Sequence, residues 1–237
     1  MVDHCTEVLV VHVIEVRVER EDRVLGHLLG GQSREHASHV AVVAEELASV
    51  QSGLIDYLQL LVKWNRAYNL TAVRQPEQMV TRHLLDSLVI GPYLQGPRIQ
   101  DVGTGAGLPG IPLALAYPDF HFTLLDSNGK KIRFVTQAVA ELGLANVDVI
   151  QSRIEAFQPE CRFDTITARA YASIEELISQ TTRLLADKGQ YLIMKGVYPV
   201  AEVEAIPSAY RVEAIHQLNV PKLDAERHLL VVRTEPS

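Results

Sequence analysis

Ten residues near the middle of the chain have types and spacing that suit ligand binding. The stretch Asp101–Gly110 reads Asp-Val-Gly-Thr-Gly-Ala-Gly-Leu-Pro-Gly, after a strand-like run at 98–102 and before an apolar helical run. Glycine accepts positive φ and has no Cβ, so a ligand can lie directly against the backbone of such a turn. The N–H groups at the start of the next helix point towards that ligand. Taken alone, the pattern is equally compatible with a tight turn that binds nothing.

A second acid, Asp126, ends the next strand-like run, 121–126. A strand, a Gly-rich turn, a helix and a strand ending in an acid form the nucleoside-binding half of a doubly wound fold. The glycine spacing is not the Gly-x-Gly-x-x-Gly of dinucleotide sites, and no lysine follows as in a phosphate-binding P-loop. S-adenosylmethionine needs no pyrophosphate cradle. We expect it to lie against Gly103 and Gly105, with Asp101 near its cationic groups and Asp126 on the ribose hydroxyls.

Further stretches resemble, in order, those of the ribosomal RNA small-subunit methyltransferase G family, also called glucose-inhibited division protein B. The resemblance runs from about residue 52 to the end of the chain. Three runs are specific in combination: Asn-Leu-Thr, Arg-His-x-x-Asp-Ser and Gly-Leu-Pro-Gly-Ile-Pro. The matching stretches are Lys63–Thr71, Arg82–Ser87, Asp101–Pro112, Leu124–Ser127, Gln151–Glu155, Phe163-Asp164, Ala168–Ala170, Lys195-Gly196 and Glu226–Leu229.

This resemblance implies an α/β protein with the class I S-adenosylmethionine-dependent methyltransferase fold, which is Rossmann-like. It implies a mostly parallel seven-stranded sheet with helices on both faces and an N-terminal helical extension. The implied reaction is methyl transfer from S-adenosyl-L-methionine to N7 of one guanine in the decoding-centre hairpin of 16S rRNA. Matched residue by residue, the resemblance places cofactor contacts at Gly103, Leu108, Ile154, Glu155 and Arg169. A surface salt bridge is the alternative role for Arg169.

The implied chemistry needs no general base, because guanine N7 already has an in-plane lone pair. Catalysis would rest on alignment and electrostatics. Arg169-Ala-Tyr171 stands where other classes carry a Pro-Cys nucleophile or an Asn/Asp-Pro-Pro-Tyr motif. We predict positioning roles for four residues, namely Asn69, His83, Arg153 and Lys195.

Other residues are candidates for binding RNA, because basic groups meet phosphates or the acceptor edge of guanine and aromatic rings stack on bases. They are Asn65, Arg66, Tyr171, Arg227 and His228, and each has a structural role as its alternative. His83 and Asp86 share one helix face. They form either a local pair that supports the helix or a face that closes over the ligand pocket.

From Arg98 onward, expected strands alternate with expected helices, and these elements position the residues above. Strands are expected at 98–102, 121–126, 147–151, 163–168, 189–196, 210–218 and 227–233, with helices at 108–117, 129–143, 173–186 and near 200–206. Strands separated by helices predict a parallel sheet, and the last two strands, which lack a long helix between them, should be antiparallel. A helix is expected at 37–66, either continuous or broken near Gly53, and another from Pro76 to about Gly91.

Composition limits the remaining possibilities. The chain has 237 residues, 47% of them hydrophobic, and a net charge of −7. We expect an atypical extension at 1–50 with a strand-like start, a helical cap at 51–95 and a methyltransferase domain at 96–237. No membrane-spanning run, signal peptide, disulfide framework or metal site is expected. We therefore expect a cytoplasmic monomer that acts on the small ribosomal subunit or its assembly intermediate. The acidic charge leaves a small-molecule methyltransferase as an alternative, and a non-catalytic ribosome-assembly factor is another.

Overall fold

A seven-stranded mixed sheet forms the centre of the protein in the computed structural model, which describes the backbone of residues 33–235 and the side chains of residues 46–235. The strand order is β3-β2-β1-β4-β5-β7-β6. The first five strands are parallel, and β7 lies antiparallel between β5 and β6. The strands are β1 (Arg98–Val102), β2 (His121–Asp126), β3 (Val147–Gln151), β4 (Phe163–Arg169), β5 (Leu185–Lys195), β6 (Tyr210–Gln217) and β7 (His228–Thr234).

The predicted strands are confirmed, and the bounds of the first three are unchanged. The antiparallel pairing of the last two is also confirmed, although β7 additionally inserts between β5 and β6. β5 begins at Leu185, before the predicted start at 189. Leu185 pairs with Phe163 ahead of a register shift, after which Gln190 pairs with Thr165. Residues 186–189 lie in this irregular part of the ladder. The predicted strand therefore began only at Gly189, after the irregularity.

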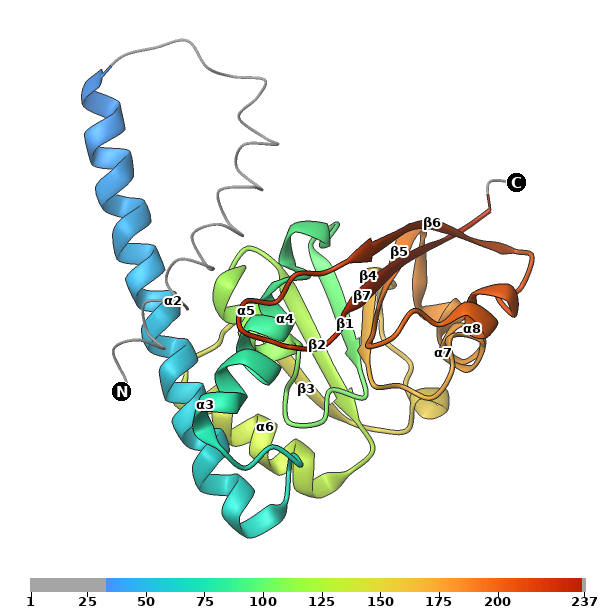
Figure 1. Ribbon diagram of the computed structural model, residues 1–237, viewed down its shortest axis with the longest axis horizontal. Helices are drawn as coiled ribbons and strands as arrows, with labels where there is room; N and C mark the ends of the chain where they lie inside the picture. The colour runs from blue at the N-terminus through green and yellow to red at the C-terminus, as the bar shows by residue number, and fades with distance from the viewer. Residues whose placement is uncertain (1–32, 236–237) are drawn as a thin grey trace.

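Helices cover both faces of the sheet (Figure 1). One core cluster packs the long helix α2 (Ser33–Tyr68), α5 (Gly110–Ala116) and α6 (Gly129–Glu141) against one face. A second cluster packs α7 (Ile174–Thr181), with the short α8 (Val200–Glu204) beside it, against the other face. Gly53 does not interrupt α2, because an apolar stripe on both sides of it is buried. The predicted domain boundary at residue 50 falls inside this helix, whereas the predicted strand-like start lies outside the described residues.

The helix predicted from Pro76 consists of three segments in sequence. These are α3 (Pro76–Met79), a π-helical segment η1 (Val80–Leu85) and α4 (Asp86–Leu88), followed by the 3₁₀ turn η2 (Gly91–Tyr93). A π turn contains one residue more than an α turn, so it changes the direction of the side chains that follow. The apolar pattern of 76–91 did not predict this change. His83, within the π-helical segment, and Asp86, directly after it, are both buried.

Within residues 33–235, no helix has the length and apolar character needed to cross a membrane.

Candidate active site

The Gly-rich turn is held in place from beneath by Asp101, the fourth residue of β1. Asp101 is fully buried, and its Oδ2 accepts hydrogen bonds from Thr104 Oγ1 (2.6 Å) and the Gly110 amide (3.0 Å). Its Oδ1 has no hydrogen-bond partner among the described residues. Burial raises the pKa of Asp101 to about 6, although the two hydrogen bonds and nearby Arg169 oppose the shift. Asp101 therefore links both ends of the turn.

The glycines of this turn adopt the backbone conformation for which glycine is suited. Gly103, Gly105 and Gly107 have φ of 69°, 62° and 87°. The Gly103 amide donates to the Leu125 carbonyl (2.8 Å), and the Gly105 amide donates to Asp126 Oδ2 (3.0 Å). The turn after β1 is thus fastened directly to the end of β2, where the two acids lie on adjacent strands.

A cavity of about 210 Å³ opens beside this turn. Four predicted cofactor residues line it: Gly103, Asp126, Ile154 and Glu155. Leu108 is buried within the turn, and Asp101 lies beneath it. The predicted positioning residue Arg153 and the predicted RNA-binding residue Tyr171 also line the cavity. The structure therefore brings residues from the ends of β1, β2, β3 and β4 to one place.

One residue of this site was missed by the sequence analysis. Arg183, in the 3₁₀ turn η4 (Thr182–Leu184), donates to the carbonyls of Ile154 (2.6 Å), Phe157 (2.7 Å) and Glu155 (3.4 Å). Its guanidinium group thereby fixes the 3₁₀ turn η3 (Ile154–Ala156), which forms one wall of the cavity. Nothing in the local pattern around Arg183 distinguishes it from a solvated arginine.

A second cavity, of about 430 Å³, adjoins the first. Tyr171 lines both, so its side chain lies between them. The second cavity is rich in charged side chains, with His83, Asp86 and three arginines among the residues that line it. The residues lining it are Val73, Arg82, His83, Asp86, Arg169, Ala170, Tyr171, Met194, Lys195, Gly196 and Arg227.

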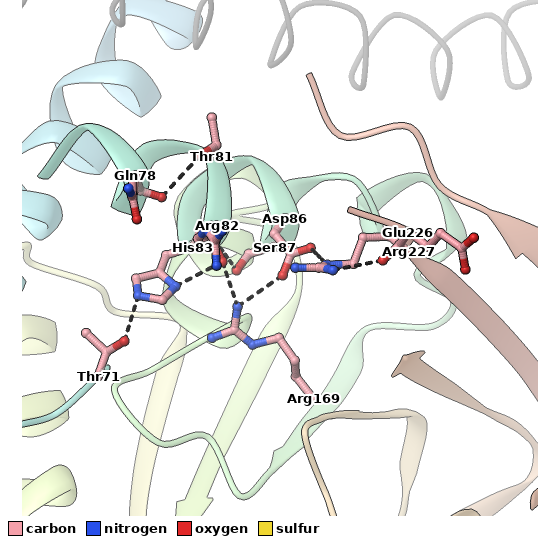
Figure 2. Close-up of polar contacts among 10 residues, drawn as sticks. All are labelled: Thr71, Gln78, Thr81, Arg82, His83, Asp86, Ser87, Arg169, Glu226 and Arg227. Atoms are coloured by element: carbon pink, nitrogen blue, oxygen red, sulfur yellow. Dashed lines mark hydrogen bonds and ion pairs between the residues drawn. The ribbon is translucent and has the colours of Figure 1, made fainter. Parts of the chain in front are cut away.

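Asp86 is the centre of an ion-pair network in this second cavity (Figure 2). Its Oδ2 lies 3.3 Å from Arg169 Nη1, and its Oδ1 lies 2.6 Å from Arg227 Nε. Arg169 also donates to the Arg82 carbonyl, and Arg227 to the Glu226 carbonyl. The salt bridge considered for Arg169 therefore exists, but its partner is a buried carboxylate and not a surface acid.

His83 does not form the local pair with Asp86. Its Nε2 lies 2.9 Å from Thr71 Oγ1, and its Nδ1 lies 2.9 Å from the Arg82 carbonyl. Because a carbonyl can only accept, Nδ1 carries the proton and Nε2 accepts from Thr71. Burial and the nearby Arg169 charge lower the pKa of His83 to about 4. His83 is therefore neutral at pH 7 and offers no positive charge to a phosphate.

Several predicted residues have structural partners. Lys195 Nζ donates to both carboxylate oxygens of Glu202 (2.9 and 2.8 Å), and His228 Nδ1 lies 2.7 Å from the Gly196 carbonyl. Asn65 was expected to contact RNA, but its amide is buried and binds the Val73 carbonyl and the Thr71 amide. Its observed role is to hold the loop after α2.

The remaining predicted residues lie on the surface. Asn69 is exposed with φ of 52°, and its Oδ1 accepts from Arg74 (2.7 Å). Arg66 and Arg153 are exposed, and neither guanidinium group has a hydrogen-bond partner in the described part of the chain. Among residues 46–235, no cluster of three His, Cys, Asp or Glu side chains is arranged to hold a metal ion.

Comparisons with known proteins agree with this architecture. Residues 50–230 match the family model described as rRNA small subunit methyltransferase G (GidB). The ribosomal RNA small subunit methyltransferase G of Pseudomonas aeruginosa (strain LESB58) is 51% identical over 207 residues, covering 85% of this chain and 97% of that one. The enzyme of the same name from Salmonella arizonae is 50% identical over 181 residues, covering 76% and 87%.

A solved structure shows the same fold at low sequence identity. The SAM-dependent methyltransferase from Aquifex aeolicus has a TM-score of 0.54 and 18% identity, covering 72% of this chain and 96% of that one. The predicted class I methyltransferase fold is thus confirmed. The chain belongs to the ribosomal RNA small subunit methyltransferase G family and is an S-adenosylmethionine-dependent methyltransferase.

Proposed function

We propose that this protein methylates N7 of a guanine in 16S rRNA, with the cofactor in the cavity beside Gly103 and the acceptor base in the cavity beside Asp86. The observation that carries the proposal is the pair of adjoining cavities that share Tyr171. They lie at the carboxyl ends of the parallel strands, where ligands bind in open α/β sheets. This arrangement supports a methyl donor and an acceptor that meet beside one aromatic ring.

The first cavity fits S-adenosyl-L-methionine. Asp126 lines it, and two main-chain amides, those of Gly105 and Asn128, donate to its carboxylate. A carboxylate has about four acceptor sites, so capacity remains for ribose hydroxyls. Ile154 and Glu155 are proposed to flank the adenine, and Gly103 lets the ligand approach the backbone. Asp101, held under the turn, contributes negative charge on the side of the ligand's cationic groups.

The second cavity fits the acceptor edge of guanine, where N7 and O6 both accept hydrogen bonds. When bound, the cofactor supplies an electrophilic methyl group. Arginine N–H groups that hold O6 would orient the base while N7 is left free for the transfer. No proton has to leave N7 first, so a neutral, buried His83 is compatible with the reaction. Tyr171 is proposed to stack on the base.

The rest of the RNA is proposed to contact the exposed side chains around these cavities. Arg153 lines the first cavity and Arg227 the second, His228 contacts the Gly196 carbonyl, and Arg66 and Asn69 are exposed elsewhere on the surface. Relatives named for small-subunit rRNA support the small subunit, or its assembly intermediate, as the partner. We further propose that the protein acts as a monomer in the cytoplasm, where these particles form.

Methyl transfer to defined RNA substrates tests the proposal. The purified protein is incubated with radiolabelled S-adenosylmethionine and either 30S particles or free 16S rRNA, and the modified base is mapped. N7-methylguanine at a single position is expected. The Gly103→Asp variant is the control. Gly103 has a φ of 69°, which disfavours aspartate, and the added side chain would lie against the Tyr171 ring in the cofactor cavity. Methylation of metabolites without RNA would favour the small-molecule alternative, and full cellular function of Gly103→Asp would favour an assembly factor.

A further inference from the structure

We propose that Asp86 is a positioning residue for methyl transfer, which holds Arg169 and Arg227 side by side so that their remaining N–H groups face the acceptor base. The inference rests on the proposed function. It adds to that function a residue that acts through the two arginines, because the Asp86 side chain is only 4% exposed and both of its oxygens are paired with them.

The hydrogen bonds of the two arginines support this role. A guanidinium group has five N–H donors. Arg169 uses Nη1 for Asp86 and the Arg82 carbonyl, while Arg227 uses Nε for Asp86 and Nη1 for the Glu226 carbonyl. The other nitrogens, Nε and Nη2 of Arg169 and Nη2 of Arg227, have no protein partner within the described residues. Both arginines line the second cavity, so unused donors are available at its wall.

Three separate parts of the chain meet at this carboxylate (Figure 2). Asp86 begins α4, Arg169 ends β4, and Arg227 immediately precedes β7. Each arginine takes a different carboxylate oxygen, so neither can be released without leaving a buried acceptor unpaired. Asp86 thereby connects the helical segment to the end of β4 and to the start of β7.

The charges explain why one acid serves two arginines. The Asp86 carboxylate offsets the charge of one guanidinium group. Asp86, Arg169 and Arg227 together therefore keep a net positive charge at the cavity. Lys195 adds little to this charge because Glu202 neutralises it. A cationic wall of N–H donors matches guanine O6 or an adjacent phosphate. It rejects adenine, which presents an amino donor where guanine presents O6.

The π-helical segment η1 places Asp86 at this point. An α-helix advances about 100° per residue, and a π turn contains one extra residue before the helix resumes. Asp86 directly follows this segment, which ends at Leu85. Its carboxylate therefore points towards the sheet at a position that a regular helix from Pro76 would give to a neighbouring side chain.

Isosteric replacement of Asp86 tests the inference. The Asp86→Asn side chain has one acceptor oxygen, so it can hold only one of the two arginines. We expect kcat/KM for methylation of 30S particles to fall about 100-fold, through kcat more than through the KM for S-adenosylmethionine. The matched control is Asp164→Asn, since Asp164 also pairs with an arginine, Arg98, but at the opposite ends of β1 and β4. This control should keep wild-type kinetics.

A double-mutant cycle with Arg227→Gln separates positioning from a general structural role. If Asp86 acts through Arg227, adding Asp86→Asn to Arg227→Gln should cost far less activity than it costs the wild type. Additive losses, or wild-type rates in Asp86→Asn, would overturn the inference. If urea denaturation shows that Asp86→Asn does not fold, the Arg227→Lys variant tests the inference instead. A folded Arg227→Lys protein with slow methyl transfer is expected, and a wild-type rate would refute the inference.

The wild-type enzyme in the same assay separates a failure of the proposed function from a failure of the positioning role. Failure of the wild type to methylate guanine would contradict the proposed function itself. A wild type that methylates guanine, together with an equally active Asp86→Asn variant, would contradict only the positioning role.

Discussion

Replacing Asp101 with asparagine should stabilise the protein at neutral pH while weakening the cofactor site. Asp101 is fully buried, and one of its oxygens has no partner among the described residues. Asparagine has the same shape, and its carbonyl oxygen can accept from Thr104 and Gly110 as Asp101 Oδ2 does. The substitution therefore removes a buried charge but keeps the hydrogen bonds that fasten the turn.

The size of the effect follows from the shifted pKa. Burial raises the pKa of Asp101 from 3.8 to about 6. The native state therefore keeps its proton at pH values where the unfolded chain has lost it. This contribution to stability is complete below pH 3.8 and is lost as pH rises through 6. At about 1.4 kcal/mol per pKa unit, the loss amounts to roughly 3 kcal/mol.

Urea unfolding of both proteins between pH 4 and pH 7, without cofactor, measures this quantity. The free energy of unfolding of Asp101→Asn, relative to wild type, should rise by about 2.4 kcal/mol across that range, which is most of the full effect. His83 has a lowered pKa and contributes with the opposite sign, but it is present in both proteins and cancels. A difference that does not vary with pH would refute the reasoning. Binding of S-adenosylmethionine, measured by calorimetry, should weaken in the variant.

Three further substitutions test the supports of the site. Tyr57→Phe removes the hydroxyl that donates to the Ala106 carbonyl (2.7 Å), and should cost about 1–3 kcal/mol in thermal or urea unfolding; an unchanged midpoint would argue against that bond. Arg183→Ala frees the η3 turn and should raise the KM for S-adenosylmethionine about tenfold, a change of about 1.4 kcal/mol, with little effect on kcat. Equal affinity in both proteins would show that the turn needs no such support. Gly110→Ala places a Cβ 2.1 Å from a Leu124 methyl group and should lower the free energy of unfolding by about 1–3 kcal/mol. A wild-type midpoint in urea unfolding would mean that the Leu124 side chain moves aside at little cost.

The strands and the Gly-rich turn could be predicted because their determinants are local. Short apolar runs, and glycines at positions with positive φ, carry their information within a few residues. The same holds for Asp126, which ends a strand next to that turn. The resemblance extended this local information to Ile154, Glu155 and Arg169, which the structure places beside the two cavities.

The partnerships at the second cavity could not be predicted, because they join distant residues. Asp86 and Arg227 are 141 positions apart, and no pattern along the chain specifies that pair. Burial also changes the chemistry that residue type alone suggests. His83 is neutral because burial lowers its pKa, and the Asn65 amide bonds the main chain of the loop that follows α2. Arg183 was missed for the same reason, since its partners are main-chain carbonyls in another turn.

The π-helical segment at 80–85 also bears on how sequences of this kind can diverge. A π turn amounts to a one-residue insertion in an α-helix. Deletion of one residue there would restore a regular and more easily formed helix, yet it would rotate Asp86 by about 100° away from both arginines. A regular helix would require one residue fewer in this segment, whereas the geometry at Asp86 requires that residue to be kept. We expect substitutions to accumulate in this segment far more readily than changes in its number of residues.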